Sequence, residues 1–340
     1  MCRFWYLYVN IANGVVTTSP SDQLEIEEKA WKAYIMDEYS INSSHVITPG
    51  VRFEEFTQES SFKNDSNKGK YDFTSPSLHY LWHITNDINL RASVAEKVKK
   101  PKFDELYTGI KSGDGSSGDP YVTGNQNLKA EKSLGYELGL EKFFDNNSGL
   151  VGVNGYYREI EDKIQSETIL KGDGNYYTTN VNIGEAKLYG VEFDTRKDLS
   201  SVIEGFNVYG NLSFMRGTWM DNGVERNLKD VPKYALNIGF DQQIPKFGLT
   251  VGAGFNRLDG FEAYESATKE KIETSRNILD VYALKNLYKN LDLRISAKNI
   301  TEVEKHKQDT EFYNSGRVKK VNNETEYSEI MYFVALEGKF

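Results

Sequence analysis

The chain ends in YSEIMYFVALEGKF (residues 327–340), and this stretch decides the fold. Successive side chains of a β-strand point to opposite faces. Sorted in this way, one face of the stretch carries Ile330, Tyr332, Val334, Leu336, Gly338 and Phe340. The opposite face is mixed and carries Glu329, Met331, Phe333, Ala335, Glu337 and Lys339. The stretch therefore predicts a strand whose apolar face packs on a protein core or lies against another apolar medium.

The same alternation recurs along the whole chain. It predicts strands at 3–13, 27–39, 45–57, 76–84, 88–98, 133–143, 149–160, 186–196, 205–216, 232–242, 248–258, 276–285, 290–300 and 327–340. In KAWKAYIMDEY (29–39) apolar residues fall on both faces, so the sequence does not orient that strand. Strands of soluble sheets average about 5–6 residues, whereas a strand that crosses a bilayer needs about 9–11. The predicted lengths favour a membrane.

Short and long connections alternate between these strands. Short turns lie at 40–44, 144–149, 242–247 and 286–290, and long polar stretches lie at 58–75, 99–132, 161–185, 217–231, 259–275 and 301–326. An up-and-down outer-membrane barrel has this pattern, with short periplasmic turns and long extracellular loops. We therefore expect an all-β protein, an antiparallel transmembrane β-barrel or partial barrel of about 14 strands. Both chain ends should lie at the periplasmic side.

Composition agrees with a β-rich chain and excludes several classes of protein. The 340 residues include 22 Tyr and 18 Phe, and the net charge of -9 argues against a nucleic-acid partner. The single cysteine, Cys2, excludes an internal disulfide and a cysteine zinc site. Mean hydropathy is -0.59, and no run reaches the roughly 18 apolar residues of a membrane helix. FWYLYV (4–9) is interrupted by Asn10 and lacks a following cleavage site, so it does not predict a signal peptide.

Groups that could catalyse a reaction or bind a metal have plainer interpretations. Four residues along a strand separate His79 from His83 by about 13 Å, too far to share one ion without other ligands. Four carboxylates fall on the predicted lumen face, where a hydrated wall with basic counter-charges explains them better than glycosidase chemistry: Glu137, Glu141, Glu192 and Asp194. KSGDGSSGDPY (111–121) lacks the terminal bidentate Glu of a calcium loop. No nucleophile elbow, HExxH or P-loop occurs. We predict no enzyme, no cofactor and no bound metal.

Five segments, in order, resemble the C-terminal barrel of TonB-dependent outer-membrane receptors. The first (32–56) ends in the family's TPG-R element, and the second (91–107) resembles its S-x6-P-x3-E-L-Y pattern. The third (124–141) resembles GNP-L-PE-S-YE-G, although Gln126 and Ala130 replace the usual prolines. NIGEAKLYGVEF (182–193) and LDLRISAKNIT (291–301) continue the order up to the terminal Phe340. Each motif alone is weak, but their order across residues 27–340 is specific.

The resemblance implies an outer-membrane receptor of a Gram-negative cell, for high-affinity uptake of a ferric siderophore or a similar iron complex. Lipid and the barrel-assembly machinery are the implied partners, and Phe340 resembles the family's C-terminal assembly signal. Two alternatives stay open. A passive diffusion porin of about 14 strands would have the same wall, and a soluble β-rich adhesin or binding module would have the same alternation.

Family members also carry a signal peptide, a TonB box and a plug domain, which residues 1–340 do not display. We therefore expect the whole chain to be the C-terminal portion of a receptor barrel, a truncated or split gene product. TonB would then be a partner only if a plug with its TonB box is supplied. From the 340 residues expressed alone we expect no TonB-dependent transport.

Candidate ligand contacts lie in two of the longest predicted loops, 99–132 and 161–185. Tyr107, Lys111 and Tyr121 form one group, and Lys171, Tyr176 and Tyr177 form the other. Aromatic and cationic side chains suit an anionic or aromatic iron chelate, through stacking, cation–π contacts and hydrogen bonds. Tyrosines at a membrane interface, or ordinary loop residues, are the alternative interpretation.

Overall fold

The structure is a computed structural model, and it describes most of the chain. The described residues are 5–17, 24–62, 65–106, 109–117, 119–144, 148–221, 223–266, 269–313 and 315–338. Tyr107 and Phe340, both named above as candidate functional residues, lie outside these ranges. The structure therefore does not test their predicted roles.

Fourteen antiparallel strands form one continuous sheet in the order in which they follow along the chain. They are β1 (Trp5–Thr17), β2 (Leu24–Asp37), β4 (His45–Phe62), β5 (Asp65–His83), β6 (Ile88–Lys99), β8 (Glu131–Phe144), β9 (Gly149–Glu161), β12 (Ala186–Asp198), β13 (Phe206–Asp221), β15 (Tyr234–Ile244), β16 (Leu249–Leu258), β19 (Arg276–Tyr288), β20 (Leu291–Lys298) and β23 (Met331–Gly338). Two short strands pair beside this path, β3 (Tyr39–Ser40) with β4 and β14 (Val224–Asn227) with β13. The predicted fold class and strand number are confirmed.

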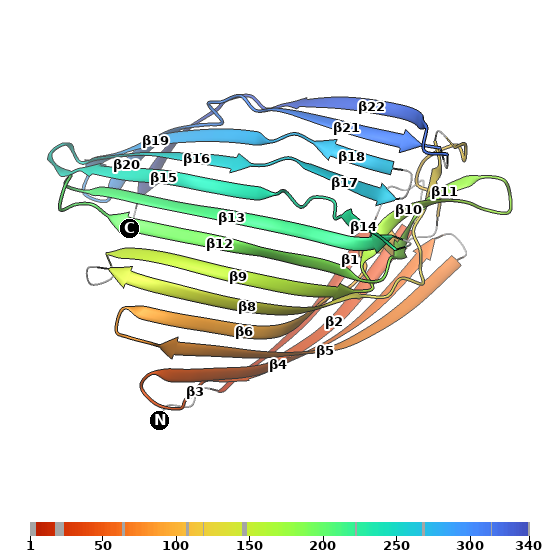
Figure 1. Cartoon of the computed structure of the whole chain (residues 1–340), viewed down its shortest axis with the longest axis horizontal. Helices are drawn as coiled ribbons and strands as arrows, with labels where there is room; N and C mark the ends of the chain where they lie inside the picture. The colour runs from red at the N-terminus through yellow and green to blue at the C-terminus, as the bar shows by residue number, and fades with distance from the viewer. Residues whose placement is uncertain are drawn as a thin grey trace.

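The two ends of the sheet differ in their connections (Figure 1). Short turns join strands at one end, here called the turn end, where a 3-10 helix η1 (Pro245–Phe247) links β15 to β16. All the long connections meet at the opposite end, here called the loop end. Both β1 and β23 have their outer ends at the turn end, because Trp5 pairs with Asp37 and Gly338 with Leu291. This placement agrees with the even strand count.

The sheet is curved and open, so that it forms a partial barrel (Figure 1). Within the described residues, β1 and β23 are the two edges and do not pair with each other. Unpaired N–H and C=O groups on such edges are costly in lipid, where nothing else satisfies them. The described strands are therefore one part of a closed structure, or close in another arrangement.

Apolar side chains project from the outer face of the wall and remain exposed. Seven apolar residues of the wall strands, which alternate with inward polar ones, illustrate this. Six of them have relative exposures of 39–66%: Tyr136, Leu138, Val191, Phe214, Ile238 and Leu336. The seventh, Leu293, is half-buried. None of the seven lies in a dry protein core, so the apolar face has no protein partner among the described residues.

The inner face carries hydrogen-bonded polar side chains at matching register positions. Asn211 donates to Asp194 at 3.3 Å, and Asn237 donates to Asn211 at 2.9 Å. Asn256 continues this row with a hydrogen bond to Asn237, so the row crosses from β12 to β16. A buried or lumen-facing amide row of this kind satisfies polar groups without needing a second protein layer. The alternation in the sequence thus separates an apolar exterior from a polar interior.

The long connections are more ordered than their polar composition predicts. In the predicted connection at 58–75, the described residues continue β4 and β5, whose pairing extends as far as Phe62 with Asp65. Two further sheets form at the loop end, one of β10 (Ile164–Leu170), β11 (Tyr176–Asn182) and β7 (Tyr121–Val122), the other of β17 (Phe261–Ser266), β18 (Lys269–Glu273), β21 (Glu304–Phe312) and β22 (Val318–Tyr327). Backbone pairing does not depend on an apolar face, so polar segments pair wherever the turn geometry sets their register.

Buried apolar side chains are few and gather at the loop end. Ala186, Trp219 and Leu228 form a cluster there, with exposures of 2%, 6% and 6%. The α-helix of the described chain, α1 (Phe103–Leu106), is four residues long, and in the described ranges no helix has the length and apolar character needed to cross a membrane. The structure therefore has no conventional globular core beneath the candidate site.

Candidate functional site

The two predicted ligand-contact groups meet in one small sheet at the loop end. β10 and β11 form a hairpin in the second long connection, and β7 of the first long connection pairs parallel to β11. This pairing sets Tyr121 directly beside Tyr177, although 56 positions separate them in the sequence. The amide N–H of Thr123 also donates to the Thr178 carbonyl at 3.0 Å. The structure thus places residues of the two predicted groups side by side in one sheet.

The aromatic rings and one cation form a compact arrangement, here called the Tyr–Lys cluster: Tyr121, Tyr177 and Lys171. The ring centroids of Tyr121 and Tyr177 are 5.4 Å apart with an interplanar angle of 53°. Lys171 Nζ lies 4.0 Å from the centroid of the Tyr177 ring. The cluster combines two half-buried aromatic rings with an exposed cation.

Local hydrogen bonds hold the Tyr177 ring in place. The Tyr177 hydroxyl donates to Asp173 Oδ2 at 2.8 Å, and this bond raises the pKa of Tyr177. The backbone N–H of Asn175 donates to Asp173 Oδ1 at 3.0 Å. Together these donors lower the pKa of Asp173, so its carboxylate stays ionised as the acceptor. Tyr177 therefore remains a neutral phenol at neutral pH.

Glycine at position 115 allows Tyr121 to pack where it does. Gly115 has φ of 82°, in the left-handed region that favours glycine. A Cβ at this position would lie 2.5 Å from Cε2 of the Tyr121 ring. The Gly115 carbonyl also accepts a hydrogen bond from the Tyr176 amide at 2.9 Å. The Gly-rich stretch around residue 115 is thus a structural support for the cluster.

Two of the six candidate residues, Lys111 and Tyr176, do not belong to the cluster. The side chain of Lys111 donates to the Asp104 carbonyl, while its backbone N–H pairs with Val122. Tyr176 is half-buried, and as the neighbour of Tyr177 along β11 it projects from the opposite face of that strand. Tyr107 lies outside the described residues. The structure therefore brings together Tyr121, Lys171 and Tyr177.

A second cation–aromatic contact at the loop end was missed from the sequence. The Arg226 guanidinium carbon lies 4.5 Å from the centroid of the Tyr264 ring, and Arg226 Nε donates to Asp221 at 2.7 Å. Arg226 lies in β14 and Asp221 at the end of β13, within one long connection. Tyr264 lies in β17, within the next long connection. No sequence spacing indicated this contact, because it depends on how separate connections pack.

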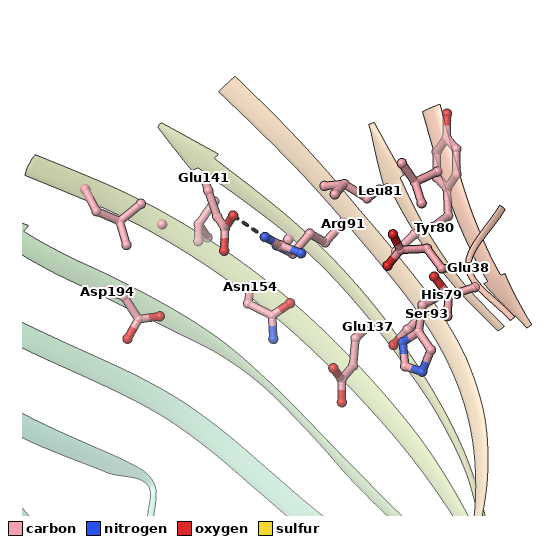
Figure 2. Close-up of a pocket in the computed structure, with 17 residues that line it drawn as sticks. Glu38, His79, Tyr80, Leu81, Arg91, Ser93, Glu137, Glu141, Asn154 and Asp194 are labelled. Carbon is pink, nitrogen blue, oxygen red and sulfur yellow. Dashed lines mark hydrogen bonds and ion pairs between the residues drawn. The ribbon is translucent and has the colours of Figure 1, made fainter. Parts of the chain in front are cut away.

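The polar inner wall forms a hollow of about 600 Å³ nearer the turn end. Figure 2 shows the side chains that line it, with His79, Glu137, Asn154 and Asp194 projecting into the space that the curved strands enclose. Arg91 Nε donates to Glu141 at 3.0 Å, the one ion pair drawn there. Acidic side chains outnumber basic ones in the lining of this hollow. It is therefore an acidic, hydrated wall, as the lumen interpretation predicts.

The histidines of β5 show no arrangement for a metal ion. His83 Nδ1 lies 2.7 Å from Asn89 Oδ1, so this ring has a neighbour of its own. In the part of the chain that the structure describes, no group of three or more His, Cys, Asp or Glu side chains could hold an ion.

Comparison with protein families gives a match over most of the chain. Residues 5–300 match the model described as TonB dependent receptor-like, beta-barrel. The chain is 27% identical over 237 residues to the ferrienterobactin receptor of Escherichia coli K12, a match that covers 66% of this chain and 29% of that protein. The chain thus spans less than a third of the length of this relative.

Solved structures share the fold at low sequence identity. The siderophore receptor PiuA from Acinetobacter baumannii matches with a TM-score of 0.64 at 18% identity, covering 93% of this chain and 44% of that one. The ferric-catecholate import receptor Fiu from E. coli K12 matches with a TM-score of 0.62 at 15% identity, covering 93% and 46%. Both matches show that the curved sheet shares its fold with part of these proteins, over nearly half the length of each matched chain.

Proposed function

Because this chain belongs to the TonB-dependent receptor-like β-barrel family of the outer membrane, we propose that it forms the C-terminal portion of the barrel of a receptor that takes up a ferric siderophore or a similar iron complex. The relatives named above are receptors of ferric enterobactin, of a siderophore and of ferric catecholates. Their names support iron chelates as the cargo class for this chain as well.

The observation that carries the proposal is the Tyr–Lys cluster at the loop end. It joins two of the long connections, and it offers aromatic faces and a cation at the mouth of a barrel with an acidic inner wall. Ferric complexes of phenolate or catecholate ligands are flat, aromatic and anionic, so they suit stacking on tyrosine and attraction to lysine. A receptor that selects cargo at its outer mouth needs such groups on the loops rather than in the wall.

The loop end would face the outside of the cell and the turn end the periplasm. Passage of cargo would need TonB together with a plug segment supplied by the rest of the receptor. Recognition by the barrel-assembly machinery would use Phe340, by resemblance to the family's terminal residue. Uptake of this kind moves cargo without covalent chemistry, so we predict no catalytic residue in the chain.

Binding titrations test this proposal directly. We would use the longest natural chain that contains these residues, purified in detergent, with ferric enterobactin and a ferric hydroxamate as ligands. We expect saturable binding, and we expect Tyr177→Ala to raise Kd about three- to tenfold through loss of one stacking surface. Tyr288→Ala is the control, since it removes a tyrosine ring that lies at the turn end, away from the Tyr–Lys cluster.

Two outcomes would contradict the proposal. Steady ohmic conductance in planar bilayers, without saturable binding of any ferric chelate, would instead indicate a diffusion porin. Purification of the folded chain without detergent would instead indicate a soluble binding module. An equal effect of Tyr177→Ala and Tyr288→Ala on Kd would show that the Tyr–Lys cluster does not take part in ligand binding.

A further inference from the structure

Glu131 makes an unusual set of contacts at the base of the loop-end sheet. Its side chain is only 8% exposed, and its Oε1 accepts three hydrogen bonds. Lys163 Nζ donates at 2.9 Å, Lys99 Nζ at 3.1 Å and the backbone N–H of Ile164 at 3.0 Å. Donors from two segments that lie on either side of Glu131 in the sequence thus converge on one carboxylate oxygen.

These contacts connect the wall to the element that carries the Tyr–Lys cluster. Lys99 is the last residue of β6 and Glu131 the first of β8, so both belong to the wall. Ile164 is the first residue of β10, which pairs along its whole length with β11 and hence with Tyr177. The Glu131 carboxylate therefore fixes the root of the hairpin whose far end bears Lys171 and Tyr177.

A second tether beside Glu131 consists mainly of neutral groups. Asn182 Nδ2 donates to the carbonyls of Lys129 and Asp162, at 3.1 and 2.7 Å, and Asn182 Oδ1 accepts from the Lys129 amide at 2.9 Å. Three side chains with exposures of 3–7% pack around this point: Leu128, Ala130 and Ile164. These contacts do not titrate, so they hold the hairpin at every pH.

We propose that Glu131 is a positioning residue that holds the β10–β11 hairpin against the wall and releases it in acid. The inference rests on the proposed function only for its effect on cargo, since the hairpin's attachment can be measured without a ligand. Protonation of Glu131 removes the charged acceptor of Lys99 and Lys163. Leaving these cations without an ion-pair partner in a partly buried position costs free energy. The neutral tether and the pairing of β11 with β7 then remain, and the hairpin separates from the wall more often.

The direction of the pH effect follows from the surroundings of Glu131. Burial raises the pKa of Glu131, but Lys163, the Ile164 amide and Lys99 outweigh it, so the pKa lies below its usual range. The other charged groups here are Asp162 and Lys129, whose charged atoms lie 3.8 Å apart. Stability from the Glu131 contacts is therefore complete above the ordinary glutamate pKa, and it is lost as pH falls through the lowered pKa.

Hydrogen exchange of the whole chain in detergent tests this inference. In the wild type, exchange protection of residues 164–182, corrected for intrinsic rates, should fall at least about tenfold between about pH 5 and pH 3. Amides of 134–143 in the wall should keep their protection and serve as the internal reference. In Glu131→Gln the same hairpin amides should already be less protected at pH 7, and their protection should no longer depend on pH.

Two further variants separate positioning from general damage. Glu161→Gln is the control, because Glu161 is exposed at the end of β9 and neutralising it should leave the profile unchanged. Glu131→Asp keeps the charge and should restore part of the protection and of its pH dependence. If Glu131→Gln fails to fold, the wild-type profile with its wall reference still decides the question.

The inference is overturned if wild-type hairpin protection is flat between pH 5 and pH 3, or if Glu131→Gln retains the wild-type profile. Ferric enterobactin binding is measured in parallel at pH 7, where Glu131→Gln should raise Kd. Absence of binding by the wild type would contradict the proposed function but leave the hairpin result intact. The two hypotheses therefore fail independently.

Discussion

Antiparallel pairs predominate in both the wall and the loop-end sheets, with β7 and β11 as a parallel pair, yet the side chains of the two regions follow different rules. Strands of the wall alternate exposed apolar residues with inward polar ones, as in β8, where Leu138 is 58% exposed and Glu137 lines the hollow. In β18 all five residues, KEKIE, are half-buried, and every residue of β22 after Lys319 is exposed. Antiparallel hairpins occur in both regions, so the side-chain pattern is what distinguishes lipid-facing strands from water-facing ones.

The stabilising interactions differ accordingly. In the wall, apolar side chains gain by leaving water for lipid, and the backbone must be fully paired. In the loop-end sheets, ion pairs bridge neighbouring strands, as between Lys305 and Glu273 at 2.6 Å. Such pairs are weak near water and are screened by salt. The comparison therefore predicts that the same substitution has different consequences in the two regions.

The largest expected effect comes from placing a charge on each region in turn. Leu138→Arg should lower the free energy of unfolding by about 2–4 kcal/mol if the site lies near mid-membrane, because the guanidinium must enter lipid. Leu170→Arg is the matched variant, since Leu170 is 60% exposed at the end of β10. It should change stability by less than about 0.5 kcal/mol. Denaturant unfolding from lipid vesicles measures both, and equal costs would contradict the assignment of the wall to the membrane.

A smaller effect is expected where a tyrosine lies on a glycine of the inner wall. A Cβ at Gly190 would lie 2.6 Å from the Tyr156 hydroxyl oxygen and closer still to the Phe214 carbonyl. Gly190→Val should therefore cost about 1–3 kcal/mol through overpacking. Gly155→Ala is the control, since the nearest atom to its Cβ would be 4.0 Å away. Comparable destabilisation by both substitutions would show that strand propensity, not close packing, sets the cost.

The smallest effect concerns the ion pairs of the second loop-end sheet. Lys305→Met should weaken the pairing of β18 with β21 by about 0.2–1 kcal/mol at low salt, and the difference should vanish near 1 M salt. Hydrogen exchange of residues 269–273 measures this, with 134–143 of the wall as reference. An equal salt-dependent change in the exchange protection of residues 134–143 would contradict the predicted difference between the wall and the loop-end sheets.

Periodicity alone predicted the wall closely. The expected strand 133–143 is β8 (Glu131–Phe144), and the expected strand 186–196 is β12 (Ala186–Asp198). Alternation is a local property, so it is readable without knowing any long-range contact. It failed to orient 29–39, because apolar residues occur on both faces there. In the structure Ala30 is 8% exposed and lies opposite Phe56, whereas Trp31 is 45% exposed.

The candidate site was only partly readable from the sequence. The residue types and loops of Tyr121, Lys171 and Tyr177 were predicted, but their meeting depends on the parallel pairing of β7 with β11. Glu131 was noted only as part of a motif, since nothing local indicates that Lys99 and Lys163 converge on it. Arg226 and Tyr264 were missed for the same reason.

The sequence by itself therefore determined which strand faces are apolar, apart from the strand at 29–39. It also determined the strand number and the two kinds of connection. All of these follow from residues that are neighbours along the chain. Tertiary structure decided which loops pair, which cation faces which ring and which carboxylate holds the hairpin. Several of those contacts join distant segments, 32 positions apart from Glu131 to Lys163 and 56 positions apart from Tyr121 to Tyr177. Their register is set by backbone hydrogen bonds, which carry no side-chain signature in the sequence.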